Sequence, residues 1–408
     1  MKRCWLHIGM HKTGTTSLQA SLASVDDPVG WNYIRIDSRR NLGSALYAMF
    51  SSKPHRYHWF QKRGDTPEQV AKAGAKLRKK FIKAIEACTE ENFIISGESL
   101  SLIDPRGIAA LHKFLKPLCD EIRVIGYVRP PIGFKISFFQ QRVKHSNCTF
   151  DFSDFRLNYY RRFKKFDNVF GVENVILRKF EPALFKNQCV VEDLCEQIGI
   201  PAPESVSVIR VNESLCREAC GILYAYRKFG PDYGVGLDVI KESKHILAPF
   251  LAMKGTKFKV SRTVVDSSLE LEKEDLQWME QRLGASFCED VPDDGTEVAD
   301  EADLLRIERS SCVEFADRFR EIHGIQLPDG LLSAESPVAP QRVADFLEYA
   351  QNLCRKRIQE RRASKPKPLP KKLVSKKLVP KKSKSKSWRI FRRCWKWLKT
   401  KARSNRGS

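Results

Sequence analysis

Short apolar runs alternate with longer amphipathic stretches along the first part of the chain. Each short run has the length of a buried strand, and the stretches between them repeat apolar residues at helical spacing. The runs that predict strands are residues 4–8, 31–37 (an edge-like strand), 93–96, 122–128 and 174–180. The stretches that predict helices begin at Thr15 and at Pro131 or span residues 41–50, 66–90, 105–118, 151–166 and 185–198.

Strands that alternate with helices predict an α/β fold, with a mostly parallel sheet flanked by helices on both faces. Beyond residue 290 the pattern changes, because eight Asp or Glu residues fall within residues 289–303 and helical periodicity returns after them. The sequence therefore predicts an α/β domain with a helical extension and a tail. The expected divisions are 1–290 (α/β domain), 291–302 (acidic linker), 303–362 (helical extension), 363–387 (disordered Lys/Pro/Ser spacer) and 388–403 (basic amphipathic helix). The extension either packs on the α/β domain or stands apart from it.

The net charge of +23 is distributed unevenly along the 408 residues. Residues 361–408 hold 20 Lys or Arg and no Asp or Glu, which leaves 52 basic against 49 acidic residues in 1–360. The folded part is therefore nearly neutral, at +3. A general affinity for nucleic acid is not expected of it, because its charge balance lacks the excess of cations that phosphate binding requires.

The tail ends in a segment with three tryptophans and a cationic face. In residues 388–403, the aromatic and aliphatic side chains fall on one half of a helical wheel and the Arg and Lys side chains on the other. This composition is typical of a peptide that lies on an anionic membrane surface. A polyanion-binding arm and an inert tail are the alternatives. The segment is too short and too charged to span a bilayer.

The N-terminal strand leads into a short polar loop from Gly9 to Gly14, which is followed at once by a helix. A strand, a glycine-containing loop and a helix form a phosphate cradle, where backbone N–H groups and the helix dipole meet an anion. The glycine spacing matches the first half of a Walker A loop, but Thr15 stands where that motif has Lys, and Lys12 is the cation of the loop. The predicted fold is therefore similar to that of P-loop nucleotide-binding proteins.

The segment HKTGTT, residues 11–16, resembles the 5′-phosphosulfate-binding loop of sulfotransferases that use 3′-phosphoadenosine-5′-phosphosulfate. Arg129, at the end of the predicted strand 122–128, and Ser137, eight residues later, resemble the pair that binds the 3′-phosphate of that donor. The resemblance covers about residues 1–290 and is specific only at 7–17 and 129–137. It implies that the donor is bound by His11, Lys12, Thr13, Gly14, Thr15, Thr16, Ser17, Arg129 and Ser137.

The resemblance also implies a catalytic base and a closing loop. Glu98, two residues past the strand 93–96, resembles the glutamate that takes the proton of the acceptor, and Lys12 is the expected catalytic cation. The alternative for Glu98 is a structural place in a helix start capped by Ser96. Lys254 and Gly255 resemble a Lys-Gly loop that closes over the adenosine and the 3′-phosphate, although Met253 replaces the flanking Arg. No metal is implied.

The resemblance implies transfer of a sulfuryl group to a hydroxyl or amine, and the acceptor is expected to be a carbohydrate, a glycolipid or a small molecule. Two other functions stay open: a P-loop kinase that uses ATP and magnesium, and a non-catalytic module that binds membranes or polyanions. The twelve cysteines form no CxxC pair, and no signal peptide or N-terminal membrane helix is recognisable. We therefore expect a cytoplasmic protein, peripheral on the inner face of the membrane if its tail binds lipid.

Overall fold

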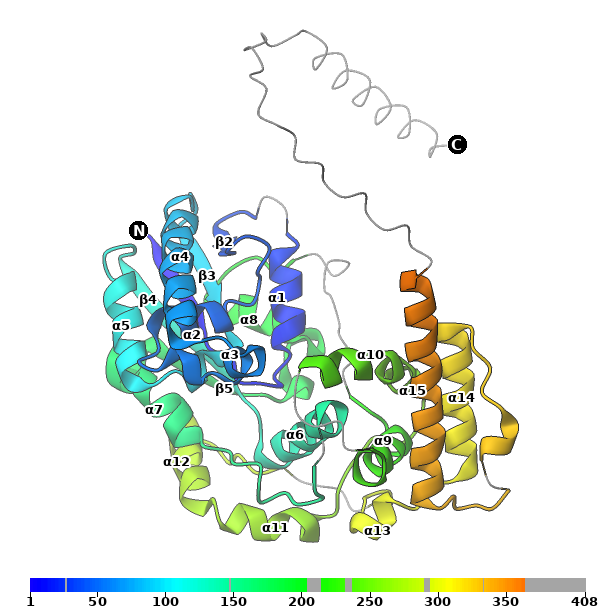
Figure 1. Ribbon diagram of the computed structural model, residues 1–408. Coiled ribbons are helices and arrows are strands. Elements are labelled where there is room, and N and C mark those ends of the chain that lie inside the picture. The colour runs from blue at the N-terminus through cyan, green and yellow to red at the C-terminus, as the bar shows by residue number, and fades with distance from the viewer. Residues whose placement is uncertain are drawn as a thin grey trace, which may run out of the picture. The chain divides into compact units, whose positions relative to one another are not determined.

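A parallel β-sheet runs through the part of the protein that the computed structural model describes, which comprises residues 1–25, 28–146, 148–203, 214–231, 237–289, 294–332 and 334–363, without the side chains of 237–244, 329 and 361–363. Its strands are β1 (Arg3–His7), β2 (Trp31–Tyr33), β3 (Asn92–Ser96), β4 (Glu121–Val128) and β5 (Val175–Lys179). They lie in the order β2-β3-β1-β4-β5, and every neighbouring pair is parallel. The predicted α/β fold with a parallel sheet is confirmed (Figure 1).

Helices connect the strands and continue beyond the sheet (Figure 1). The α-helices are α1 (Thr15–Ala23), α2 (Gly43–Phe50), α3 (His58–Arg63), α4 (Pro67–Glu86), α5 (Pro105–Leu115), α6 (Pro131–His145), α7 (Tyr159–Phe170), α8 (Val190–Ile198), α9 (Arg217–Phe229), α10 (Leu237–Ala252), α11 (Arg262–Glu270), α12 (Lys273–Leu283), α13 (Glu301–Leu304), α14 (Arg309–His323) and α15 (Pro340–Ala363). Short 3₁₀ turns are η1 (Pro54–Arg56), η2 (Glu98–Leu102), η3 (Val172–Asn174), η4 (Pro182–Leu184), η5 (Lys186–Gln188) and η7 (Asp329–Leu331).

Helices cover both faces of the sheet. Alternate residues of each strand point to opposite faces, so each strand contributes to an apolar cluster on either side. Trp5 of β1 belongs to an apolar cluster with Leu18 of α1 and Leu194 of α8. Its neighbours Cys4 and Leu6 belong to a second cluster, which includes buried side chains of α2, α4, α5 and α7. The sheet is thus buried on both sides, which accounts for strands that read as short continuous apolar runs.

Two predicted boundaries need correction. The strand predicted over 31–37 ends at Tyr33, because Asp37 has a φ of 55° and the chain turns there, with an antiparallel bridge between Ile36 and Arg39. The helix predicted over 185–198 begins only at Val190, because the residues before it include two with positive φ. These are Asn187 and Gln188, at 49° and 52°.

The helix predicted over 151–166 is wrong in its first half, since α7 begins at Tyr159. Asn158, just before it, has a φ of 54°, which no helix interior accepts. The carboxylate of Asp275 accepts the N–H groups of Tyr159 and Tyr160 at 2.6 and 2.7 Å and thereby replaces the intrahelical partners that a first turn lacks. The start of α7 is therefore set by a residue more than a hundred positions away.

A buried ion pair holds the irregular segment before α7. The ammonium of Lys135, on α6, lies 2.8 Å from the carboxylate of Glu272 and also donates to the carbonyls of Phe152 and Phe155, at 3.2 and 3.0 Å. Glu272 in turn accepts the N–H of Leu157 at 2.7 Å. The backbone of this segment finds its partners in side chains of other elements, so its apolar residues are buried without a helix.

The helical extension packs on the α/β domain. The ring of Phe315, on α14, lies 4.4 Å from that of Phe250 on α10 and 6.0 Å from that of Phe346 on α15. These rings belong to the same apolar cluster as Cys4 of the central strand. Residues 1–358 form one compact unit. The structure thus shows that α14, and α15 up to residue 358, pack on the α/β domain and do not stand apart from it.

The described end of the acidic stretch is also attached to this unit. Val298 is fully buried, and its backbone exchanges hydrogen bonds with Lys259 and Ser261, at 3.0 and 2.9 Å. The ammonium of Lys259 lies 2.5 Å from the carboxylate of Asp294. The predicted spacer 363–387 and the predicted helix 388–403 lie outside the described residues, apart from the backbone of Ala363.

Candidate functional site

The polar loop of residues 8–14 follows the central strand of the sheet. The N–H groups of Ile8 and Met10 donate to Ile125 and Tyr127 on β4, at 3.0 and 2.9 Å, so the chain remains attached to the sheet as it leaves β1. Gly9 lies between them with a φ of 85°. The loop thus emerges at the carboxyl edge of a parallel sheet, where ligands bind in open α/β folds.

The loop ends in a helix start that has no side-chain cap. Gly14 is the N-cap of α1 in the left-handed conformation, with a φ of 70°, and as a glycine it offers no side-chain acceptor to the first turn. The first intrahelical hydrogen bond runs from the N–H of Leu18 to the carbonyl of Gly14, at 3.0 Å. The N–H groups before Leu18 therefore lack intrahelical acceptors, and the positive end of the helix dipole lies with them. Such an end binds anions.

Lys12 stands inside this loop in a conformation that lysine rarely adopts. Its φ is 69°, and its side chain is half-buried. A residue with a side chain in the left-handed region costs on the order of 1 kcal/mol and is found chiefly where the surroundings enforce it. The fold thus holds Lys12 in a constrained backbone conformation two residues before the N-cap of α1.

Thr13 and Thr15 were expected to bind the anion, but their hydroxyls stabilise the loop itself. Thr13 is fully buried, and its hydroxyl donates to the carbonyl of Met10 at 2.7 Å; that of Thr15 donates to the same carbonyl at 3.3 Å. Thr16 is exposed, and Ser17 is half-buried. The contribution of Thr13 and Thr15 to a bound anion is therefore expected from their N–H groups.

Arg129, the residue that follows β4, contacts the loop, and its binding of a 3′-phosphate stays a prediction. A guanidinium N–H of Arg129 donates to the carbonyl of Lys12, and its backbone N–H lies 3.3 Å from the sulfur of Met10. The hydroxyl of Tyr159 donates to the carbonyl of Arg129 at 2.6 Å. Burial lowers the pKa of Arg129 from its usual value. The two separate motifs of the sequence thus meet in one place.

A carboxylate occupies the start of α6 beside Arg129. Glu289 accepts the N–H groups of Ile132 and Gly133, at 2.7 and 2.9 Å, and burial raises its pKa. It also attracts the Arg129 guanidinium electrostatically. Ser137 is half-buried further along α6. The region where the resemblance implies a 3′-phosphate therefore already contains an anionic group of the protein.

Glu98 lies next to the loop. It is the first residue of η2 and half-buried, and a Cβ on Gly9 would lie 2.8 Å from its carbonyl oxygen. The hydroxyl of the adjacent Ser99 is 2.6 Å from the hydroxyl of Tyr57; burial raises the pKa of that tyrosine, and the charge of Glu98 adds to the shift. The carboxylate of Glu98 therefore lies within electrostatic reach of Tyr57, close to the loop.

Ser96 does not cap this turn, contrary to the structural alternative for Glu98, because Gly97 is the N-cap. The hydroxyl of Ser96 instead lies 2.8 Å from Nδ1 of His7 and accepts from the amide of Gln19 at 3.0 Å. These three buried side chains join β3, β1 and α1 behind the loop. This hydrogen bonding of His7, Ser96 and Gln19 was not predicted from the sequence, although a single histidine in an apolar strand indicates a buried polar partner.

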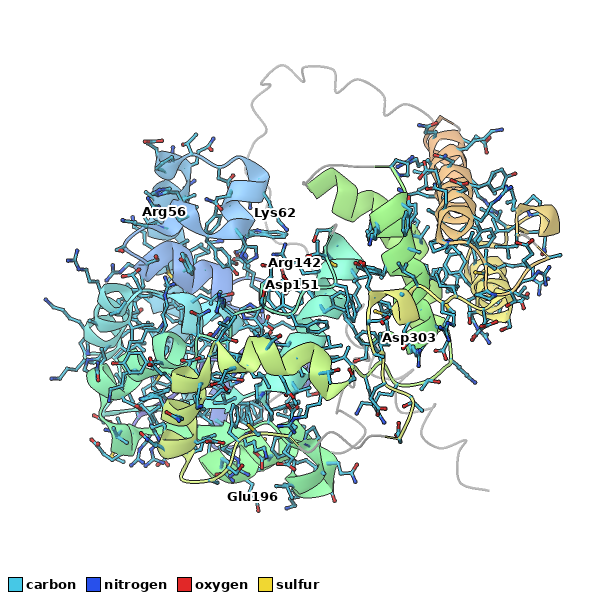
Figure 2. All side chains as sticks on the ribbon, turned by 90° about the horizontal axis from the view of Figure 1, so that it is seen from below. Arg56, Lys62, Arg142, Asp151, Glu196 and Asp303 are labelled. Carbon is cyan, nitrogen blue, oxygen red and sulfur yellow. The ribbon has the colours of Figure 1, made fainter. Side chains whose placement is uncertain are left out.

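Cationic side chains surround His11. Burial, together with the charges of Arg162, His58 and Lys12, lowers the pKa of His11 to about 3. His145, at the end of α6, has its pKa lowered to about 4, chiefly by burial and then by charges that include those of Lys12 and Lys62. Figure 2 shows Lys62 on the side of α3 that faces α6. The loop therefore lies in a positive field, which suits an anionic ligand.

The contacts of Lys254 and Gly255 are with the helical part of the chain. The N–H of Lys254 donates to the carboxylate of Glu314 on α14 at 2.8 Å. A Cβ on Gly255 would lie 2.1 Å from the carboxylate of Glu218 on α9. Their predicted place over the adenosine stays a prediction.

The rest of the described chain has a surface hollow, but neither a cluster of metal ligands nor a membrane-spanning helix. No group of three or more His, Cys, Asp or Glu side chains within the described ranges is arranged to hold a metal ion. A surface hollow of about 670 Å³ lies beside α11 and α12, lined by residues that include Arg262, Glu270 and Cys288. In the described part of the chain, no helix combines the length and the apolar character that crossing a membrane requires.

Comparison with known proteins gives only weak structural likenesses. No protein-family model matches the chain, and no curated protein matches it. A solved structure, the crystal structure of a sulfotransferase from Alicyclobacillus acidocaldarius, aligns with a TM-score of 0.34 and 14% sequence identity, over 56% of this chain and 93% of that one. At this identity and TM-score the likeness does not establish common descent or a shared activity.

Proposed function

We propose that the protein is a sulfotransferase that transfers the sulfuryl group of 3′-phosphoadenosine-5′-phosphosulfate to a hydroxyl or amine. The acceptor that we propose is a carbohydrate, a glycolipid or a small molecule. The observation that carries the proposal is the contact of Arg129 with the carbonyl of Lys12, because it joins the two motifs that resemble the donor site of sulfotransferases. The absence of a Walker lysine after Gly14 argues against a kinase.

The residues present fit such a donor. The uncapped start of α1 and the ammonium of Lys12 would hold the 5′-phosphosulfate, and the guanidinium of Arg129 would hold the 3′-phosphate together with Ser137. One N–H of Arg129 donates to the loop, and a guanidinium has five N–H donors, so the others would be able to bind a phosphate. His11 and Thr16 lie at the same loop and complete the proposed donor site.

The proposed reaction is an in-line displacement at sulfur. The acceptor oxygen or nitrogen forms a bond to sulfur, the bond from sulfur to the phosphate oxygen breaks, and the leaving phosphate keeps the electron pair. Lys12 and the N–H groups at the start of α1 stabilise the charge that grows on this phosphate. The carboxylate of Glu98 takes the acceptor's proton. The backbone of this residue lies against Gly9 of the loop, which supports this role.

A transfer assay tests the proposal. The protein is incubated with sulfur-35-labelled donor and an extract of polysaccharides and lipids, and label in the acceptor fraction is counted. We expect transfer by the wild type and by Lys53→Ala, an exposed control. Lys12→Ala should lose transfer, and Glu98→Gln should lose a factor of about 10² to 10⁴, the usual contribution of a general base.

Two results would contradict the proposal. One is equal transfer by the wild type and Lys12→Ala, since the loop would then not hold the donor. The other is transfer of phosphorus-32 from the γ-position of ATP with magnesium and no transfer of sulfur-35, which would favour the kinase.

A further inference from the structure

Helix α7 crosses between the two strand ends that carry the proposed site. At its start, the hydroxyl of Tyr159 donates to the carbonyl of Arg129, at the end of β4, at 2.6 Å. Two turns later, the buried ammonium of Lys165 donates to the carbonyl of Ser101, in the turn that begins with Glu98, also at 2.6 Å. Arg162 lies midway between these contacts along the helix and around it. It therefore stands on the part of α7 that is nearest the two ends.

The guanidinium of Arg162 is only partly satisfied. Its Nε donates to the carbonyl of Leu157 at 2.8 Å, and its central carbon lies 5.7 Å from the ring centre of Phe134. Nη1 is buried and has no hydrogen-bond partner among the described residues. Burial lowers the pKa of this arginine. Native proteins rarely leave a buried N–H of a charged group without an acceptor, because the loss of hydration costs free energy.

The surroundings do not supply the missing acceptor. His11 lies within electrostatic reach of Arg162, Lys12 and His58, which are cationic or become so on protonation. The carboxylate of Asp275 attracts Arg162 electrostatically, but its two oxygens accept the N–H groups of Tyr159 and Tyr160. An anionic oxygen that enters beside His11 would satisfy Nη1 and reduce the repulsion among these cations.

We propose that Arg162 binds an anionic oxygen of a ligand held at the phosphosulfate loop. This inference rests on the function proposed above and adds a binding residue to it. The oxyanion has two possible sources: the sulfuryl group of the donor, or a sulfate or carboxylate group on an acidic acceptor. Both present the same chemistry to a guanidinium, which pairs with two oxygens at once.

Calorimetric titrations of the full chain test the proposal and separate the sources. The probes are 3′-phosphoadenosine-5′-phosphate, the same nucleotide with its sulfuryl group, and a heparin-derived oligosaccharide added with saturating bisphosphate. The variant is Arg162→Gln, and the control is Arg161→Gln, which removes the same charge from an exposed neighbour. Arg162→Lys is the second variant, in case Arg162→Gln does not fold. It keeps the positive charge but loses the planar guanidinium that can donate two hydrogen bonds at once.

If the sulfuryl group is the source, Arg162→Gln should weaken binding of the sulfated nucleotide about tenfold or more and that of the bisphosphate less than about twofold, as expected for one charge-assisted hydrogen bond. If the acceptor is the source, Arg162→Gln should bind both nucleotides as the wild type does, and it should no longer bind the oligosaccharide. Arg162→Lys should show the same pattern in weaker form.

The proposal is overturned if the Arg162 variants match Arg161→Gln with all three probes while the wild type binds them. A wild type that binds neither nucleotide contradicts the proposed function instead. The wild-type titration therefore reports on the function, and the comparison of Arg162 with Arg161 reports on this inference.

Discussion

Gly9 connects the two halves of the proposed site at the scale of a single residue. Its φ of 85° lies in the region that glycine alone adopts freely, and a Cβ there would stand 2.8 Å from the carbonyl oxygen of Glu98. The loop that carries Lys12 can therefore lie directly against the turn that carries Glu98. The close packing of this loop against the turn depends on the missing side chain.

We expect Gly9→Ala to be costly for this reason. Backbone strain and the clash together should lower the free energy of unfolding by about 2–4 kcal/mol, since each strained feature costs on the order of 1–3 kcal/mol. Gly64→Ala is the matched control, because Gly64 has a φ of 69° with nothing within 4 Å, and it should cost about 1 kcal/mol. Urea unfolding measures both, and equal losses would mean that Gly9 does not pack against Glu98.

Buried His7 makes the stability of the fold sensitive to acid. Burial lowers its pKa from 6.5 to about 4, so the unfolded chain takes up this proton at a higher pH than the folded chain. The stabilisation by neutral His7 is complete above pH 6.5 and is lost as the pH falls toward 4. His7→Gln should flatten the decline of stability between pH 7 and pH 4 by an amount on the order of 2–3 kcal/mol. An unchanged slope would show that His7 is not the group that titrates.

At the scale of elements, the sequence predicted regular structure well where one periodicity dominates. The strand 93–96, the helix 105–118 and the strand 122–128 match β3, α5 and β4 within a few residues. The helix predicted over 151–166 failed because its partners are distant: Lys135 and Glu272 hold the backbone before α7, and no local pattern contains them.

The site was predictable to a similar extent. The loop and Arg129 were found because each has a local signature, and the structure brings them into contact. His7 and Glu289 have hydrogen-bond partners that are remote in sequence, so only the fold shows their place. For Glu289 in particular, the sequence showed only a position in an acidic stretch at the end of the predicted α/β domain, whereas the structure shows that its carboxylate accepts hydrogen bonds from the start of α6.

Glu289 at the start of α6 is expected to compete with a bound phosphate. Glu289→Gln keeps an acceptor for the N–H groups of Ile132 and Gly133 but removes the charge beside Arg129. We expect 3′-phosphoadenosine-5′-phosphate to bind about threefold tighter or more, and stability to fall by about 0.3–1 kcal/mol, the usual effect of an anion at a helix start. Glu173→Gln, on an exposed turn, is the control. Unchanged or weaker binding would contradict this role.

At the scale of the whole molecule, the chain combines a nearly neutral folded part with a strongly basic tail. Residues 361–408 hold 20 of the 72 Lys and Arg residues and no acidic residue. The compact unit ends at residue 358, so the cationic charge follows the folded part and does not belong to its core. We propose that the tail brings the enzyme to an anionic membrane surface, which would favour acceptors made there.

Vesicle sedimentation tests the tail. The full chain should bind vesicles that contain phosphatidylglycerol, and a chain of residues 1–363 should not, because each cation near such a surface contributes on the order of 1 kcal/mol. Binding should weaken as salt rises from about 0.1 to 1 M, since the Debye length falls from about 10 to 3 Å. Equal binding by both chains would contradict the proposal. Retention of the full chain on heparin without vesicle binding would favour the polyanion alternative.

The loop of residues 9–14 and Arg129 are proposed to form one site for a 3′,5′-bisphosphorylated adenosine. Thermal unfolding tests this proposal, with 3′-phosphoadenosine-5′-phosphate, with ATP plus magnesium, and with adenosine 5′-phosphate as ligands. We expect stabilisation by about 2.7 kcal/mol at a hundredfold excess of bisphosphate over its dissociation constant. This shift should disappear in Lys12→Ala and in Arg129→Ala and be small with the monophosphate. Stabilisation by ATP with magnesium alone, or none by the bisphosphate, would show that the loop and Arg129 do not form this site.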